Sequence, residues 1–168
     1  TPGTKVDEIS GTIEDVIRSY GCQPVSNLTG HGLGQWEGHA EPTIHNVRTG
    51  NRYVLQEGDV IAVEPFATNG SGRIKDSEPS VIFSLVNMKP VRSAGARKII
   101  RDIEAFNGLP FAERWLGSSF KTRLAMRELK QSGALYEYPV LKEVSKGIVA
   151  QAEHTVVVKE TPIITTKL

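Results

Sequence analysis

Apolar residues recur every three or four positions over residues 4–20, which is the period of an amphipathic α-helix. Thr4 precedes this run as a candidate N-cap, and Gly21 follows it as a stop signal. The pattern therefore predicts a helix with one buried face. The apolar positions on that face are Val6, Ile9, Ile13, Val16, Ile17 and Tyr20.

The pattern then changes to short apolar runs separated by turns. Residues 27–52 are rich in Gly, Asn, Pro and His, and they predict short extended segments in a loop that carries function. Residues 53–67 contain a turn at EGD followed by the apolar strand VIAVEPF, which one acid, Glu64, interrupts. Residues 80–86, SVIFSLV, predict another buried strand.

From Arg92 onward the helical period returns. Residues 96–106, 110–116 and 118–133 predict three successive short helices, the second starting at Pro110 and the third closing at Gly133. Residues 147–167 are rich in Val, Ile and Thr and predict two antiparallel strands joined by a turn near KETP. The residues expected to face inward from the first and third helices are Ile99, Ile100, Ile103 and Phe106, and Phe120, Leu124 and Leu129.

This order of elements predicts an α+β fold in which a helical insertion interrupts a sheet domain. We place the boundaries at residues 1–89 for the first part of the sheet domain, 90–140 for the insertion and 141–168 for the final strands. Composition supports the division, because Arg92 to Lys146 holds eleven Lys or Arg and six Asp or Glu in a chain whose net charge is +1.

Composition excludes several classes of protein. With 20 basic and 19 acidic side chains, no overall field attracts the chain to nucleic acid or to an anionic membrane, and no apolar stretch is long enough to span a bilayer. The single cysteine, Cys22, excludes an intrachain disulfide and fits a reducing, cytoplasmic compartment. The first residues, TPGTKVDEIS, lack an initiator methionine, which leads us to expect a fragment, a processed product or a trimmed chain.

Four side chains have the chemistry of a metal site. His31 lies between two glycines that leave room for a ligand, and His39 follows eight residues later. Glu64 and Glu153 are single acids inside apolar runs, where an ionised carboxylate needs a partner or a metal. Such mixed oxygen and nitrogen donors suit Mn²⁺, Fe²⁺, Co²⁺ or Zn²⁺. The alternative is that the histidines lie on a surface loop and the glutamates face water at strand edges.

Other chemistries find less support. The string GHGLG lacks the Gly-Lys-Ser/Thr ending of a phosphate loop, and Cys22 has no paired base. Three helices followed by strands are also the layout of a winged-helix module, whose recognition helix would expose Lys121, Arg123, Arg127 and Lys130. The alternative is a solvated helix face with mixed charges, and binding of nucleic acid is not expected.

Three segments occur in an order that resembles the C-terminal part of type II methionine aminopeptidases: NLTGHGLGQWEGHAEPTI, GDVIAVEPFATNGSG and VAQAEHTVVV. The resemblance covers essentially the whole chain, including the helical insertion. It implies the pita-bread fold and a hydrolase that uses two divalent ions (Co, Mn, Fe or Zn) to remove the initiator methionine from the N-termini of nascent polypeptides.

The resemblance also implies a role for each candidate residue. His31 and Glu64 resemble metal ligands, and Glu153 resembles the carboxylate that bridges the two ions. Glu64 would also accept a proton during the reaction. His39 resembles the histidine that contacts the scissile peptide, and Tyr138 resembles a tyrosine near the methionine pocket.

One departure from the family pattern is large. The family site also uses two aspartates and a further histidine from the N-terminal half, and Asp59 and Asp76 are poor substitutes because they lie in a turn and a Gly/Ser-rich loop. We therefore expect the chain to need that half and to be inactive alone. The alternative function is a non-catalytic pita-bread relative that binds protein or RNA.

Overall fold

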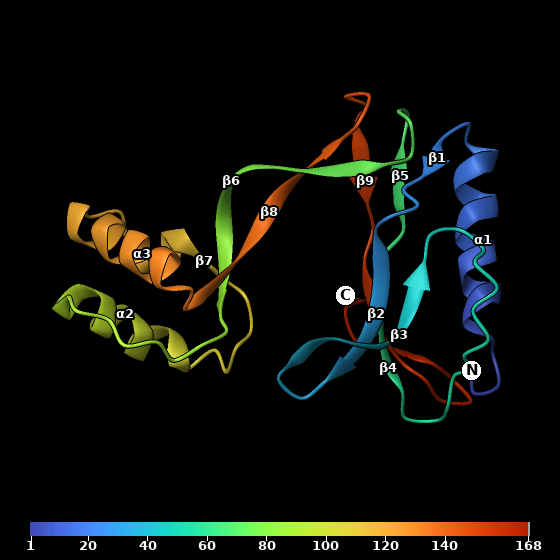
Figure 1. Ribbon diagram of the computed structural model, residues 1–168. Helices are drawn as coiled ribbons and strands as arrows, with labels where there is room; N and C mark the ends of the chain where they lie inside the picture. Colours follow the sequence, from blue (N-terminus) through green and yellow to red (C-terminus); the bar gives the residue numbers. More distant parts are fainter. Residues whose placement is uncertain (168) are drawn as a thin grey trace. The chain divides into compact units, whose positions relative to one another are not determined.

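The computed structural model describes residues 1–167, which form two units (Figure 1). The first unit comprises Thr1–Lys75 and Lys142–Leu168, and the second comprises Asp76–Leu141. The predicted insertion, residues 90–140, lies inside the second unit, which also takes in most of one long strand that precedes it. Both units mix helix and strand, as an α+β fold requires.

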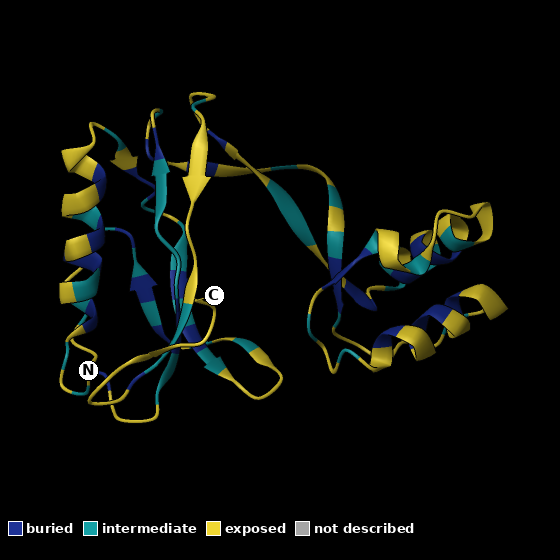
Figure 2. Ribbon diagram, turned by 180° about the vertical axis from the view of Figure 1, so that it is seen from behind, coloured by how far each residue is buried: buried dark blue, intermediate teal, exposed yellow. Residues whose placement is uncertain are grey.

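The first unit builds a five-stranded sheet in the order β11-β10-β4-β2-β3 and a three-stranded sheet in the order β1-β5-β9. Helix α1 contributes its buried face to an apolar cluster with residues of the strands and loops (Figure 2). The cluster consists of Val6, Ile13, Ile17, Ile44, Leu55, Ile61 and Val158. The elements are α1 (Val6–Ser19), β1 (Gln23–Pro24), β2 (Thr29–Gly34), β3 (Glu37–His45), β4 (Val60–Val63), β5 (Phe66–Thr68), β9 (Val149–Gln151), β10 (His154–Val157) and β11 (Ile163–Ile164).

The first helix forms where the sequence predicts it, with one correction at its start. Lys5 occupies the N-cap position and its side chain makes no capping hydrogen bond, so Thr4 is not the cap. The helix instead begins against the chain at Tyr53, because the Val6 N–H donates to the Tyr53 carbonyl. Gly21 has φ +71°, the left-handed backbone that glycine adopts just after a helix.

The second unit places two helices and a three-stranded sheet, β7-β6-β8, around its own core. The core is centred on the buried side chains Phe83, Ile103, Phe111, Met126 and Leu129. The elements are β6 (Ile74–Leu85), α2 (Ala94–Glu104), β7 (Phe111–Ala112), the short 3₁₀ helix η1 (Glu113–Leu116), α3 (Phe120–Ser132) and β8 (Leu135–Glu143).

Three predictions for this unit need correction. Residues 110–116 are not one helix, because Phe111 and Ala112 pair with β6 as a buried strand before η1 begins. Phe120 and Leu124 point outward, at 66% and 51% exposure, and α3 buries Ala125, Met126 and Leu129 instead. Within residues 80–86 only two positions, Phe83 and Ser84, are buried, because the core meets β6 near its end.

A buried carboxylate joins two turns of the first unit. The Glu143 side chain, only 4% exposed by residue, accepts hydrogen bonds from the Ser71 N–H and hydroxyl, from the Ser145 hydroxyl and from the Gly147 N–H. A Cβ on Gly70 would overlap this carboxylate and displace it from its hydrogen bonds. The hydrogen bonds, led by those of Ser71, hold the pKa of Glu143 down to about 2, although burial opposes them.

No helix of the described residues is long and apolar enough to cross a membrane.

We predict that Leu129→Ala destabilises the second unit by about 2–5 kcal/mol, because Leu129 is fully buried and its truncation leaves a cavity. Leu124→Ala, on the exposed side of the same helix, is the matched control and should change stability by less than about 0.5 kcal/mol. Urea unfolding monitored by far-UV circular dichroism measures both. Equal effects of the two substitutions would contradict the assigned helix face.

We also predict that Glu143 makes stability depend on pH. Since folding lowers its pKa from 4.5 to about 2, its contribution is complete above pH 4.5 and is lost as the pH falls toward 2. The stability difference between the wild type and Glu143→Gln should therefore shrink over that window in urea unfolding. Glu160→Gln, at an exposed position, is the control and should show no such trend. A stability difference between the wild type and Glu143→Gln that stays constant from pH 7 to pH 2 would contradict this role of Glu143.

Candidate metal centre

Strands β2 and β3 form a hairpin that carries His31 and His39. The two imidazole rings lie 4.2 Å apart between centroids, tilted by 40°. A Cβ on Gly30 would overlap the carbonyl oxygen of Ala62 in β4, and one on Gly32 would overlap the backbone of β3. The glycines beside His31 therefore let the neighbouring strands approach, which corrects the expectation that they leave room for a ligand.

The pairing of β4 and β5 with β10 and β9 is interrupted for two residues. Val63 pairs with His154 before the interruption, and Phe66 pairs with Gln151 after it, in the same antiparallel register. Pro65 lies inside the interruption and has no N–H to donate to a neighbouring strand. We call this interruption, residues 64–65 opposite 152–153, the strand break.

The strand break holds both candidate glutamates. Because the register is the same on either side, Glu64 and Glu153 fall opposite each other across it. The charge of Glu153 also raises the pKa of Glu64, as a nearby carboxylate does. Residues 89 positions apart in sequence thus meet at one point of the sheet.

His31 and Glu64 are in direct contact. The His31 Nε2 lies 3.0 Å from the Glu64 Oε1, and both side chains are largely buried, at 13% and 14% exposure. The His31 Nδ1 lies 2.9 Å from the Gly32 carbonyl oxygen, which can only accept a hydrogen bond. A hydrogen bond at this position needs a proton on Nδ1 and turns Nε2 toward Glu64, as does the outer hydrogen bond that orients a metal-binding histidine.

Gln151 is a site residue that sequence reasoning missed. Its Nε2 donates to the Glu64 Oε2 at 2.9 Å, so both oxygens of Glu64 have a neighbour. The only signal in the sequence is that Gln151 stands two positions before Glu153, which is the spacing of residues on one face of a strand. That signal becomes useful only when Glu153 is already assigned.

Burial and charge shift the pKa values of two site residues. Burial, with the charge of Glu153 next, raises the pKa of Glu64, although the contacts with His31 and Gln151 act against the rise. Burial, with the charge of His31 next, lowers the pKa of His39. The site therefore favours a carboxyl group that holds a proton more readily than usual and a neutral His39.

These residues fit part of a metal site. The 3.0 Å between the His31 Nε2 and the Glu64 Oε1 is close to the separation of two atoms that bind the same divalent ion, each at about 2.0–2.2 Å. Among the described residues, however, no group of three His, Cys, Asp or Glu side chains is arranged to hold a metal. The structure thus brings His31, His39 and Glu64 together and sets Glu153 across the strand break, without forming a three-ligand cage.

The remaining candidate residues lie elsewhere. Tyr138 belongs to β8 in the second unit, where its hydroxyl lies 3.5 Å from the Ser84 hydroxyl, and its role stays a prediction. Asp59 accepts a hydrogen bond from the Gln56 N–H at 2.8 Å within the turn before β4.

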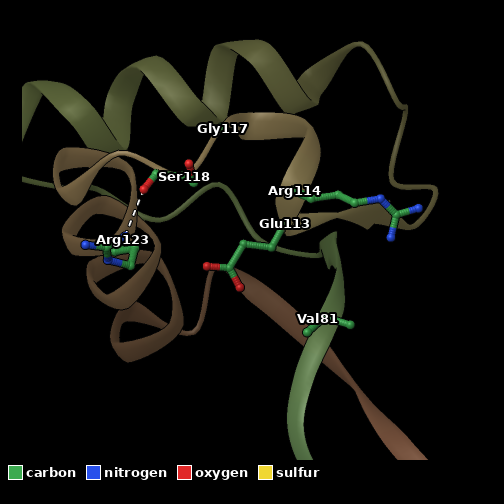
Figure 3. Close-up of a pocket in the computed structure, with 6 residues that line it drawn as sticks. All are labelled: Val81, Glu113, Arg114, Gly117, Ser118 and Arg123. Atoms are coloured by element: carbon green, nitrogen blue, oxygen red, sulfur yellow. Dashed lines mark hydrogen bonds between the residues drawn. The ribbon is translucent and has the colours of Figure 1, made fainter.

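The second unit contains a pocket of about 370 Å³ that includes none of the candidate ligands (Figure 3). Arg123 lies at this pocket and donates to the Ser118 carbonyl at 2.8 Å. Lys130 pairs with Glu137 at 3.3 Å and lies over the Phe83 ring, so it is not the exposed base that a recognition helix would present. The pocket is lined by Val81, Glu113, Arg114, Gly117, Ser118 and Arg123.

Residues 1–160 match the metallopeptidase family M24. The chain belongs to this family. It is 47% identical to a methionine aminopeptidase of Thermococcus onnurineus over 98% of the chain, and 46% identical to one of Archaeoglobus fulgidus over 94% of the chain. It spans 58% and 54% of these two relatives, a little over half of their length.

Solved structures agree on the fold. A thermophilic Arx1 superposes on 92% of the chain with a TM-score of 0.74 and 22% identity, and the chain covers 43% of that protein. A methionine aminopeptidase of Thermotoga maritima superposes on the whole chain with a TM-score of 0.59 and 21% identity, and the chain covers 45% of it. The predicted pita-bread fold and family are therefore confirmed.

We predict that Gly30→Ala destabilises the first unit by about 1–3 kcal/mol and separates His31 from Glu64, because the new methyl group meets the backbone of β4. Gly34→Ala on the same strand is the control, since its Cβ would meet only the movable side chain of Glu37. Urea unfolding measures stability, and the imidazole ¹⁵N shifts of the four histidines report the contact. Unchanged His31 shifts in a folded Gly30→Ala protein would contradict this account.

Proposed function

We propose that this chain forms part of a metal-dependent aminopeptidase that removes the initiator methionine from polypeptide N-termini. The observation that carries the proposal is the His31 and Glu64 pair, buried together at 3.0 Å within a chain of a metallopeptidase family. The names of the relatives at 46–47% identity supply the substrate class.

Each candidate residue has a role in this proposal. His31 would hold a divalent ion through Nε2, with Nδ1 kept in place by the Gly32 carbonyl. Glu64 would bind an ion and accept the proton of the attacking water. Glu153, opposite it, would bridge two ions. When bound, two divalent ions (Co, Mn, Fe or Zn) would supply the Lewis acidity that activates the water and the scissile carbonyl.

His39 and Tyr138 would handle the substrate. The lowered pKa of His39 keeps its ring neutral near pH 7, so one ring nitrogen can donate a hydrogen bond to the scissile peptide as negative charge develops there. Tyr138 would contact the methionine side chain, as the family resemblance implies.

The proposal also requires ligands from outside this chain. The relatives are nearly twice as long as the matched segment, and two aspartates of the family pattern are proposed to come from the part that the match does not span. On this proposal the 168 residues bind metal weakly and do not release methionine by themselves. A non-catalytic binding module would have no need to keep His31, His39, Glu64 and Glu153 together.

The test is reconstitution. The chain, joined to the complementary N-terminal part of the Thermococcus onnurineus relative, should release methionine from a short Met-Gly peptide when Mn²⁺ or Co²⁺ is supplied. Glu64→Gln should lower kcat/KM by about 10²–10⁴-fold, because it removes the proton acceptor.

Glu57→Gln is the matched control for this experiment, because Glu57 is an exposed glutamate in the turn before β4. It should leave kcat/KM within about twofold of the wild type. Absence of metal-dependent release by the joined protein, or equal losses for the two glutamine variants, would refute the enzymatic proposal.

A further inference from the structure

Asn46 follows the last residue of β3 and is completely buried. Its amide group bonds to two backbone segments that are far apart in sequence. The Nδ2 donates to the Leu28 carbonyl at 2.8 Å, and the Oδ1 accepts from the Phe66 N–H at 3.1 Å. Leu28 stands just before β2, and Phe66 opens β5. The side chain thus joins the start of β2, which carries His31, to the start of β5, which follows Glu64.

Asn46 lies where two paired segments of the sheet differ in length. His31 pairs with Ala62, and Pro24 pairs with Ala67. The chain therefore advances seven residues from Pro24 to His31, while the segment opposite it advances only five, from Ala62 to Ala67. Two extra residues must therefore bulge out of the segment between β1 and β2. A bulge of this kind leaves backbone groups without a partner in the ladder.

The Leu28 carbonyl and the Phe66 N–H flank this bulge, and Asn46 bonds to both. Leaving either group without a hydrogen bond inside the protein is unfavourable, because the group has already lost its contact with water. Asparagine suits the position because its short planar amide offers a donor and an acceptor together. Aspartate at neutral pH can only accept, and leucine can do neither.

The two bonds also fix distances within the candidate metal centre. His31 stands three residues after Leu28, and Glu64 stands two residues before Phe66. Glu64 lies in the strand break, where its backbone is not paired with a neighbouring strand. Its position therefore depends on how the residues before and after it are held. We propose that Asn46 is a positioning residue that sets the spacing of His31 and Glu64 by holding the ends of their segments together. This inference rests on the proposed function only for its consequence for metal binding.

Asn46→Asp tests the proposal with the smallest change in shape. The carboxylate can still accept from the Phe66 N–H but repels the Leu28 carbonyl, so β2 should move away from the strand break. In the metal-free chain at one fixed pH, the imidazole ¹⁵N and ¹H shifts of His31 should change, since its contact with Glu64 is lost. Titration with Co²⁺ alone, followed by visible absorption, should show a dissociation constant raised about tenfold or more.

Asn51→Asp is the matched control. Asn51 also bonds to two backbone groups, the Thr43 carbonyl at 3.0 Å and the Tyr53 N–H at 2.9 Å, but neither adjoins the strand break. It should lower stability while leaving the His31 shifts and the Co²⁺ titration unchanged. A purely structural role for Asn46 would make the two variants alike.

Asn46→Ser replaces the aspartate variant if that protein does not fold at 25 °C. The serine hydroxyl can reach one backbone partner but not both, so an intermediate change in the His31 shifts is expected. Unchanged His31 shifts in either folded Asn46 variant would overturn the proposal. This readout needs no metal and no peptide, so its failure is distinct from a failure of methionine release by the joined protein.

Discussion

The strand break at Pro65 is the constraint around which the first unit is arranged. Pro65 has no N–H for a neighbouring strand, and the pairing is interrupted there for two residues while the register stays the same on both sides; the Ala152 N–H still donates to the Pro65 carbonyl at 3.1 Å. Two residues that stand opposite each other across this strand break point to the same face of the sheet. Glu64 and Glu153 occupy the strand break, and His31 reaches it from the adjacent strand.

Glu64 is largely buried, and the exposed Glu153 stands opposite it, so that two carboxylates repel one another across the strand break. Burial raises the pKa of Glu64 most and the charge of Glu153 raises it further, while the contact with His31 and the hydrogen bond from Gln151 offset only part of the rise. Positive charge is what such a place lacks, and a divalent ion supplies it more compactly than any side chain. The electrostatics and the membership of a metallopeptidase family therefore support the same chemistry from independent directions.

Much of this arrangement could be predicted from the sequence. The helix at residues 6–19, the two helices α2 and α3, and the α+β order follow from hydrophobic period and turn residues, because these signals are local. Glu64 and Glu153 stood out because an acid in an apolar run is costly. The resemblance to type II methionine aminopeptidases gave the fold, which the comparisons confirm.

Other features could not be predicted because they depend on contacts between distant segments. Phe111 and Ala112 form a strand only because β6 lies beside them, although Pro110 looks like the start of a helix. The glycines around His31 serve the approach of β3 and β4, which no local pattern records. Gln151 and Asn46 are ordinary polar residues in sequence, and their importance comes from the backbone and side-chain groups that folding places against them.

The way the chain leaves and re-enters the first unit has a consequence for how such proteins can change. It departs after Lys75 and returns at Lys142, and the Val144 N–H donates to the Arg73 carbonyl at 2.9 Å, so exit and return are adjacent. The Glu143 carboxylate fastens the same two turns. A segment whose ends are already held side by side can be lengthened, shortened or exchanged at little entropic cost to its host. The 66-residue second unit is thus a place where descendants of this fold can acquire new surfaces while the histidines and glutamates stay where they are.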